Sequence, residues 1–160
     1  MTYELSAAGW VDLPAGAARS GGLVRVEERL AAAAGAAVLS AGPDDLVVAL
    51  DRVGRRALRR AQEGRAHLPE LREFPVDSWV VEPAEGPLVD ALGSLDSAAI
   101  TGGAALVAAL VDEVLPALAA AYRSRHAVAS PVAEPSTRAF LDHAARSVDA
   151  DSGWLGALRF

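Results

Sequence analysis

Apolar residues recur every three to four positions along most of this chain, and this period predicts amphipathic helices. The four main helices predicted in this way cover residues 23–40, 43–68, 87–125 and 135–158. The third stretch is loosened around Gly102 and Gly103, so we expect its first part, near 87–97, to form a short extra helix. Pro116 lies inside the rest of that stretch and is expected to kink it, because proline removes a helical N–H.

The connections between these helices differ in length. Short loops join the first helix to the second and the third to the fourth, which makes each pair antiparallel neighbours. Residues 69–86 are rich in proline and predict one long extended crossover between the pairs. The sequence therefore predicts an all-α, up-down-down-up four-helix bundle. A single domain would cover 23–160, preceded by an irregular lead over residues 1–22.

Three of the predicted helices aim one carboxylate at the common core. At about 100° per residue, Glu27 lies inside the apolar stripe of the first helix, Glu113 at the edge of the third and Asp151 near the centre of the last. A buried, unpaired carboxylate is costly, so such a group should be protonated, paired or bound to a metal. The alternative is that these acids are solvated or paired with arginine, and Arg60 on the second helix could face Glu27.

This pattern resembles the ferritin-like superfamily, whose bundles place one Glu on each of two helices and Glu-x-x-His on the other two, around two metal ions. The resemblance covers about residues 23–158, with Glu27 and Glu113 where the single glutamates would stand. The positions of the two Glu-x-x-His pairs hold Ala61, Gly64, Asp151 and Trp154. Both ligand histidines are replaced, so the resemblance implies a degenerate member that lacks most of the di-metal ligands.

Loss of those ligands favours a non-metallated ferritin-like accessory, binding or interaction protein, acting as a homodimer or with a protein partner and without a cofactor. The alternative is a metal- or oxygen-dependent enzyme that holds iron or manganese on Glu27, Glu113 and Asp151. A third possibility is a small-molecule pocket between the second and last helices. The small residues Ala61 and Gly64 would leave room for a ligand there, or simply let the helices approach closely. No motif assigns a catalytic residue.

Composition narrows these choices. The chain contains 36 alanines, which suits helices, and no cysteine, which excludes disulfide scaffolds, thiolate metal sites and a cysteine nucleophile. The formal net charge is −6, and this acidic balance argues against a nucleic-acid surface. All 15 basic residues are arginines. The densest run of them shares the second helix with several acids and is expected to be a solvated face.

The expected location is cytoplasmic. The N-terminus lacks a basic flank followed by an apolar core, and the most apolar run, 98–111, is shorter than the roughly 20 residues that a membrane span needs. We therefore expect no membrane contact. The C-terminal residues 154–160 are similar to the short tails that direct cargo proteins into encapsulin shells, which leaves a targeting role for this tail open.

Overall fold

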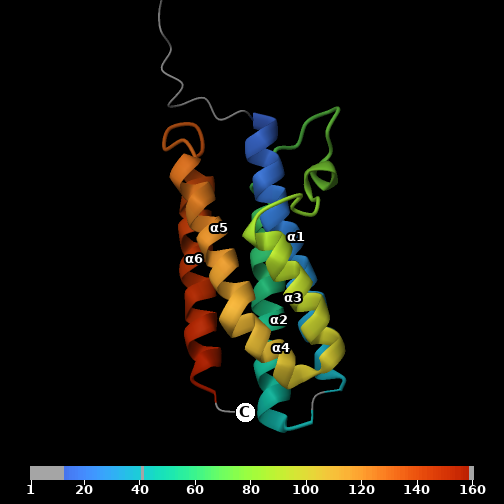
Figure 1. Ribbon diagram of the computed structural model, residues 1–160. Helices are drawn as coiled ribbons and strands as arrows, with labels where there is room; N and C mark the ends of the chain where they lie inside the picture. The colour runs from blue at the N-terminus through green and yellow to red at the C-terminus, as the bar shows by residue number, and fades with distance from the viewer. Residues whose placement is uncertain (1–12, 41, 159–160) are drawn as a thin grey trace, which may run out of the picture.

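The computed structural model describes residues 13–40 and 42–158, which form a bundle of helices (Figure 1). The bounds of the helices are α1 Leu13–Val38, α2 Asp44–Arg65, α3 Pro87–Thr101, α4 Gly103–Ala109, α5 Leu115–Val128 and α6 Pro135–Gly156. A short 3-10 turn, η1 Val76–Trp79, lies in the connection between α2 and α3. The described residues contain no β-strand beyond one isolated bridge between Leu71 and Phe74. The prediction of an all-α fold is confirmed.

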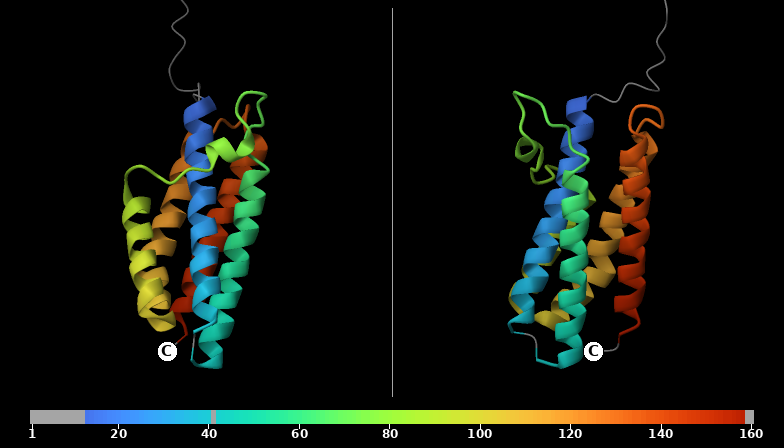
Figure 2. Two further views of the ribbon diagram at one scale, coloured as in Figure 1. Left: turned by 90° about the vertical axis from the view of Figure 1, so that its right-hand side faces the viewer. Right: turned by 180° about the vertical axis from the view of Figure 1, so that it is seen from behind.

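The direction of each helix can be followed in Figure 1. The chain descends through α1, ascends through α2, descends through α3, ascends through α4 and α5, and descends through α6. Because α3 returns along the bundle, α2 and the α4–α5 segment point the same way, as the turned views in Figure 2 also show. The closest helix pairs are α1 with α2 and α5 with α6. The connection from α2 to α4 therefore consists of the predicted crossover, residues 69–86, followed by a full helix, α3, which packs beside α1.

The first helix begins at Leu13, so residues 13–22 are helical and the prediction of an irregular lead was wrong for them. Gly21 and Gly22 lie inside this helix, and Gly21 allows close packing against another part of the chain. A Cβ atom on Gly21 would lie 1.8 Å from the carbonyl oxygen of Trp79, so the connection between α2 and α3 rests directly on α1 at this residue. The part of the predicted lead that precedes Leu13 lies outside the described residues.

Gly102 reverses the chain rather than loosening a helix. Its φ of 133° lies in a region that side chains with a Cβ rarely adopt, and it separates α3 from α4. The two helices pack against each other after this reversal. The extra helix predicted near 87–97 is therefore a separate element that extends to Thr101.

One wide turn, Leu110–Val114, separates α4 from α5 just before Pro116. There the N–H of Leu115 donates to the carbonyl of Leu110, five residues earlier, whereas an α-helix bonds four residues back. The extra residue in this turn rotates the buried face of everything that follows. An unbroken helical period counted from Leu106 predicts Ala117 and Ala121 in the core. Instead, Leu118 and Tyr122 are the fully buried residues.

The core is built mainly from leucine, valine and alanine on the inward faces of all the helices. By length and composition alone, the segment Gly103–Val128 is apolar enough to cross a membrane. The core helix of a bundle has the same composition, and Leu106, Leu110 and Leu118 on this segment are fully buried against the other helices.

Candidate functional site

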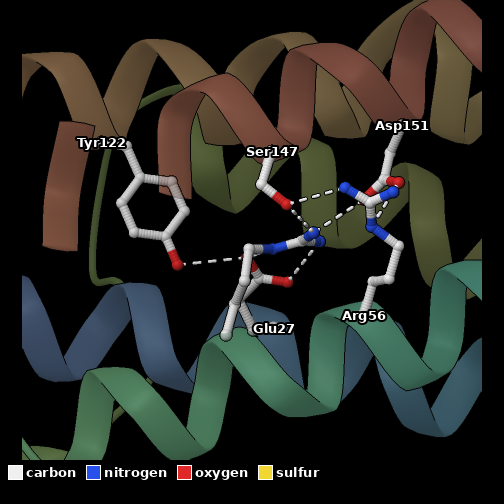
Figure 3. A network of polar contacts seen from close by, with 6 residues as sticks. Glu27, Arg56, Tyr122, Ser147 and Asp151 are labelled. Atoms are coloured by element: carbon white, nitrogen blue, oxygen red, sulfur yellow. Dashed lines mark hydrogen bonds and ion pairs between the residues drawn. The ribbon is translucent and has the colours of Figure 1, made fainter. Parts of the chain in front are cut away.

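Six polar side chains from four helices meet inside the bundle, and five of them are labelled in Figure 3. They are Glu27 from α1, Arg56 and Arg60 from α2, Tyr122 from α5, and Ser147 and Asp151 from α6. We call this group the Arg60 cluster. The carboxylates of Glu27 and Asp151 are completely buried, and Arg60 is only 3% exposed. The helical period had placed both acids inward, and this prediction is confirmed.

Arg60 joins the two buried carboxylates. Its Nε donates to Oε1 of Glu27 at 2.6 Å and its Nη2 donates to Oε2 at 3.0 Å, so the pairing with Glu27 is bidentate. Its Nη1 donates to Oδ2 of Asp151 at 2.7 Å. Charge-assisted and bidentate pairs of this kind are the strong hydrogen bonds of protein interiors. The expectation that Arg60 could face Glu27 is therefore confirmed, and the same side chain also reaches Asp151.

The remaining members complete the cluster on its two sides. The hydroxyl of Tyr122 donates to Oε1 of Glu27 at 3.1 Å. Oγ of Ser147 accepts from Nη1 of Arg60 at 3.2 Å and from Nη2 of Arg56 at 3.1 Å. Nε of Arg56 lies 2.9 Å from Oδ1 of Asp151, which makes an ion pair, but its N–H direction gives no hydrogen bond to that oxygen.

The charges in the Arg60 cluster balance one another. Burial raises the pKa of Glu27 above its ordinary value of 4.5, while Arg60 and Tyr122 lower it in part. Burial alone would lower the pKa of Arg60, but the two carboxylates around it raise that pKa overall, so the guanidinium stays charged. Burial also raises the pKa of Tyr122 well above 10.0, so its hydroxyl keeps its proton.

Glu113 does not join this cluster. It is exposed and accepts a hydrogen bond from the hydroxyl of Ser94 on α3, so the prediction that it faces the core was wrong. The helical period had placed it only at the edge of the apolar stripe, and Leu110 and Val114 take the buried positions of this turn. Among the described residues, no three His, Cys, Asp or Glu side chains are grouped so that they could hold a metal ion.

The positions that correspond to the family's histidines offer no ligand either. A Cβ on Gly64 would lie 2.9 Å from Cγ2 of Val24 and 3.3 Å from Cζ of Phe140, so Gly64 allows close helix approach and leaves no room for a longer side chain. Trp154 is half-buried on the flank of α6, with the guanidinium of Arg52 4.1 Å above its ring. The residues present therefore do not fit a di-metal centre.

The contribution of the hydrogen bond from Tyr122 to Glu27 to the stability of the protein can be measured with one substitution. Tyr122→Phe keeps the ring, which packs edge-on against Phe140 at 6.1 Å, and removes the hydrogen bond to Glu27. We expect the free energy of unfolding in urea to fall by about 1–2 kcal/mol, because a buried carboxylate loses a donor. Ser97→Ala removes an exposed hydroxyl that bonds to the backbone, and should change it by less than about 0.5 kcal/mol. Equal losses in both variants would contradict this interpretation.

A groove lies directly outside the Arg60 cluster, between α2 and α6, which stand side by side in the right-hand view of Figure 2. Its volume is about 580 Å³. Its lining consists of Arg55, Arg56, Arg59, Arg60, Glu63, His143, Arg146 and Ser147. We call it the arginine groove. A pocket between the second and last helices was one of the predicted possibilities, but arginines line it rather than small residues.

The arginines of this groove are only partly engaged by acids. Asp51 lies 2.9 Å from Nε of Arg55, and Asp142 lies 2.6 Å from Nη2 of Arg146. Each of these pairs leaves other N–H groups of the guanidinium available. Arg59 is exposed and forms no ion pair with any described residue. The prediction of a solvated arginine face therefore describes the outer rim of the groove but not its buried floor.

Comparisons of the chain with models of known protein families, with curated proteins and with solved structures found no match. The function is therefore inferred from the fold, the Arg60 cluster and the arginine groove.

Proposed function

We propose that this chain is a non-metallated, ferritin-like binding protein that takes a small polyanion in the arginine groove. One observation carries the proposal: five arginines and His143 line one groove, and three of these arginines, Arg55, Arg59 and Arg146, lie outside the charge-balanced Arg60 cluster. Glu63 is the one acid among the described residues that line it. The N–H groups that the guanidinium groups of Arg55, Arg59 and Arg146 leave free offer anions a local positive surface on an acidic protein.

The ferritin-like part of the proposal is supported by the directions of the helices. α1 and α2 form one antiparallel pair, α5 and α6 form another, and α2 and the α4–α5 segment point the same way (Figures 1 and 2). This is the up-down-down-up arrangement of bundles with one long crossover. The guanidinium of Arg60 supplies positive charge between two inward carboxylates, where the resemblance would place metal ions.

The groove suits a small molecule that carries phosphate groups. A guanidinium matches phosphate oxygens in a planar, bidentate way, and the volume of about 580 Å³ lies within the usual range for small-molecule sites. Oγ of Ser147 already accepts two hydrogen bonds from arginines, so its own proton is left to donate to a ligand oxygen. The acidic chain outside the groove would repel a long nucleic-acid backbone.

The test is to titrate pyrophosphate into the protein at fixed ionic strength. Binding is measured by calorimetry and by the shift of the thermal midpoint of unfolding. Wild-type protein should bind one equivalent and gain about 2.7 kcal/mol of stability at a hundredfold excess over Kd. Arg59→Glu should weaken binding by at least about tenfold, because it replaces an uncompensated cation of the groove with an acid.

Arg72→Glu is the matched control, because Arg72 is also exposed and lies on the connection between α2 and α3, outside the groove. It should leave the pyrophosphate Kd unchanged. Equal weakening by both variants, or no saturable binding by the wild type, would overturn the anion-binding proposal.

The metal-dependent alternative has its own test. Protein purified from cells supplemented with iron and manganese should carry no stoichiometric metal, and Glu113→Ala should leave that result unchanged because Glu113 faces outward. Two equivalents of tightly bound metal per chain would overturn the non-metallated part of the proposal without touching the anion-binding part.

A further inference from the structure

We propose a second ligand site, for an amphipathic monocarboxylate, in a groove between the start of α1, residues 81–85 and the end of α5. This groove has a volume of about 570 Å³ and shares no lining residue with the arginine groove. It lies within the usual size range for small-molecule sites. The site is independent of the function proposed above, and three observations support it: its apolar wall, a buried guanidinium with an unused donor, and the distribution of charge around it.

The wall of this groove is mostly apolar. It includes Ala18, Leu23, Val81, Leu88, Ala121 and Val128. Two of these residues, Val81 and Val128, are 49% and 48% exposed, although most large apolar side chains of the chain are buried. A ligand with an apolar body would cover both side chains and remove this surface from water.

Arg125 supplies the polar end of the site. It belongs to the lining of the groove and is 4% exposed. Its Nε donates to Oγ of Ser20 at 3.1 Å and its Nη2 donates to Glu134. Its Nη1 is buried and has no hydrogen-bond partner among the described residues. Buried donors are almost always satisfied, so the unused N–H groups of Nη1 point to an acceptor that a ligand would bring. A carboxylate oxygen is a strong acceptor for a guanidinium N–H, and it would reach the one guanidinium nitrogen that Ser20 and Glu134 leave unused.

The charges around the groove limit the negative charge that a ligand can carry. Arg19 and Arg125 line it together with Glu82 and Glu85, and Glu134 already forms an ion pair with Arg125. Arg29 and Arg25 hold Glu82, with Nε of Arg25 3.6 Å from its carboxylate. A polyanion would meet the two glutamates at close range, whereas a single carboxylate can sit at Arg125 with its apolar body on the wall. The two grooves would therefore take different classes of anion.

The experiment uses three probes with the same ten-carbon chain, each titrated calorimetrically into the full-length protein below the concentration at which it aggregates. Decanoate should bind saturably with one equivalent per chain. Decanol should bind at least about tenfold more weakly, because it lacks the charge that pairs with Arg125. Decylamine should bind more weakly than decanol.

Two variants locate the site. Ala18→Trp fills the groove from an exposed position on α1 and should abolish decanoate binding. Ala32→Trp adds the same side chain at an exposed position of the same helix away from the groove, and should bind decanoate as the wild type does. Pyrophosphate binding should be the same in both variants.

The proposal is overturned if the wild type shows no saturable decanoate binding, if decanol binds as tightly as decanoate, or if Ala18→Trp leaves the decanoate Kd unchanged. Arg125→Met adds a direct test of the carboxylate contact. In protein whose circular dichroism matches the wild type, it should bring the Kd for decanoate to within about twofold of the Kd for decanol.

Discussion

Arg60→Met is expected to lower the free energy of unfolding by about 3–5 kcal/mol, because it leaves two buried carboxylates without their common partner. Glu27 and Asp151 are both completely buried, and each accepts at least one hydrogen bond from this side chain at 3.0 Å or less. Urea unfolding, followed by circular dichroism, measures the loss. Arg56 reaches only Asp151 and Ser147, so it cannot replace the contact with Glu27.

Two further variants separate this effect from the loss of an arginine as such. Arg55→Met removes a side chain that is 79% exposed and pairs with Asp51 one helical turn away, and should cost less than about 0.5 kcal/mol. The triple variant Glu27→Gln, Arg60→Met and Asp151→Asn removes the buried charges together and should recover much of the stability that Arg60→Met loses. A triple variant no more stable than Arg60→Met would contradict the role assigned to charge compensation.

Gly21→Ala is expected to displace the connection between α2 and α3 from the surface of α1. The added Cβ would lie 1.8 Å from the carbonyl oxygen of Trp79, which is backbone and cannot rotate away. We expect a loss of about 1–3 kcal/mol, the range for overpacked sites. The fluorescence of Trp79, which is 8% exposed, should shift to longer wavelength as the connection opens to water.

Gly35→Ala is the matched control for this change. Gly35 lies in the same helix, and a Cβ there meets nothing within 4 Å. Alanine should stabilise this exposed helical position by about 0.5–1 kcal/mol relative to glycine. If Gly21→Ala were as stable as Gly35→Ala, the connection could not rest on α1 in the way described.

The sequence predicted α1 and α2 well because each is a continuous helix with one apolar face. Leu30 and Leu50 lie on the apolar stripes that the helical period predicts for residues 23–40 and 43–68, and both are fully buried. Glu27 was placed inward by the same argument. The start of α1 was missed because its first residues include Pro14 and Gly16 and show few periodic apolar positions, while Gly21 is required by a contact with Trp79, 58 residues further along the chain.

The α4–α5 segment shows where periodicity stops being informative. Its wide turn adds one residue to a helical turn, so the period counted from Leu106 still places Val114 in the core but fails beyond it, at Leu118 and Tyr122. Tyr122 was missed for this reason, whereas Glu113 had been placed only at the edge of the apolar stripe and lies on its exposed side. Pro116 marked the interruption, but a proline indicates only that one hydrogen bond is lost and not whether the helix kinks or widens.

One signal for the Arg60 cluster was available in the sequence. Arg56 and Arg60 are four residues apart on α2, and Ser147 and Asp151 are four residues apart on α6, so each pair lies on one face of its helix. Two such polar pairs on neighbouring helices indicate a network between them.

The position of Arg60 also affects what the protein needs in order to complete its folding in the cell. A bundle that relies on bound metal to balance its inward carboxylates completes its folding only when the cell supplies the ion, so its yield depends on metal availability. Here the positive charge belongs to the side chain of Arg60. It pairs with Glu27 and Asp151 when α2 packs against α1 and α6. Chelators and iron starvation should therefore leave the amount of folded protein in the cell unchanged.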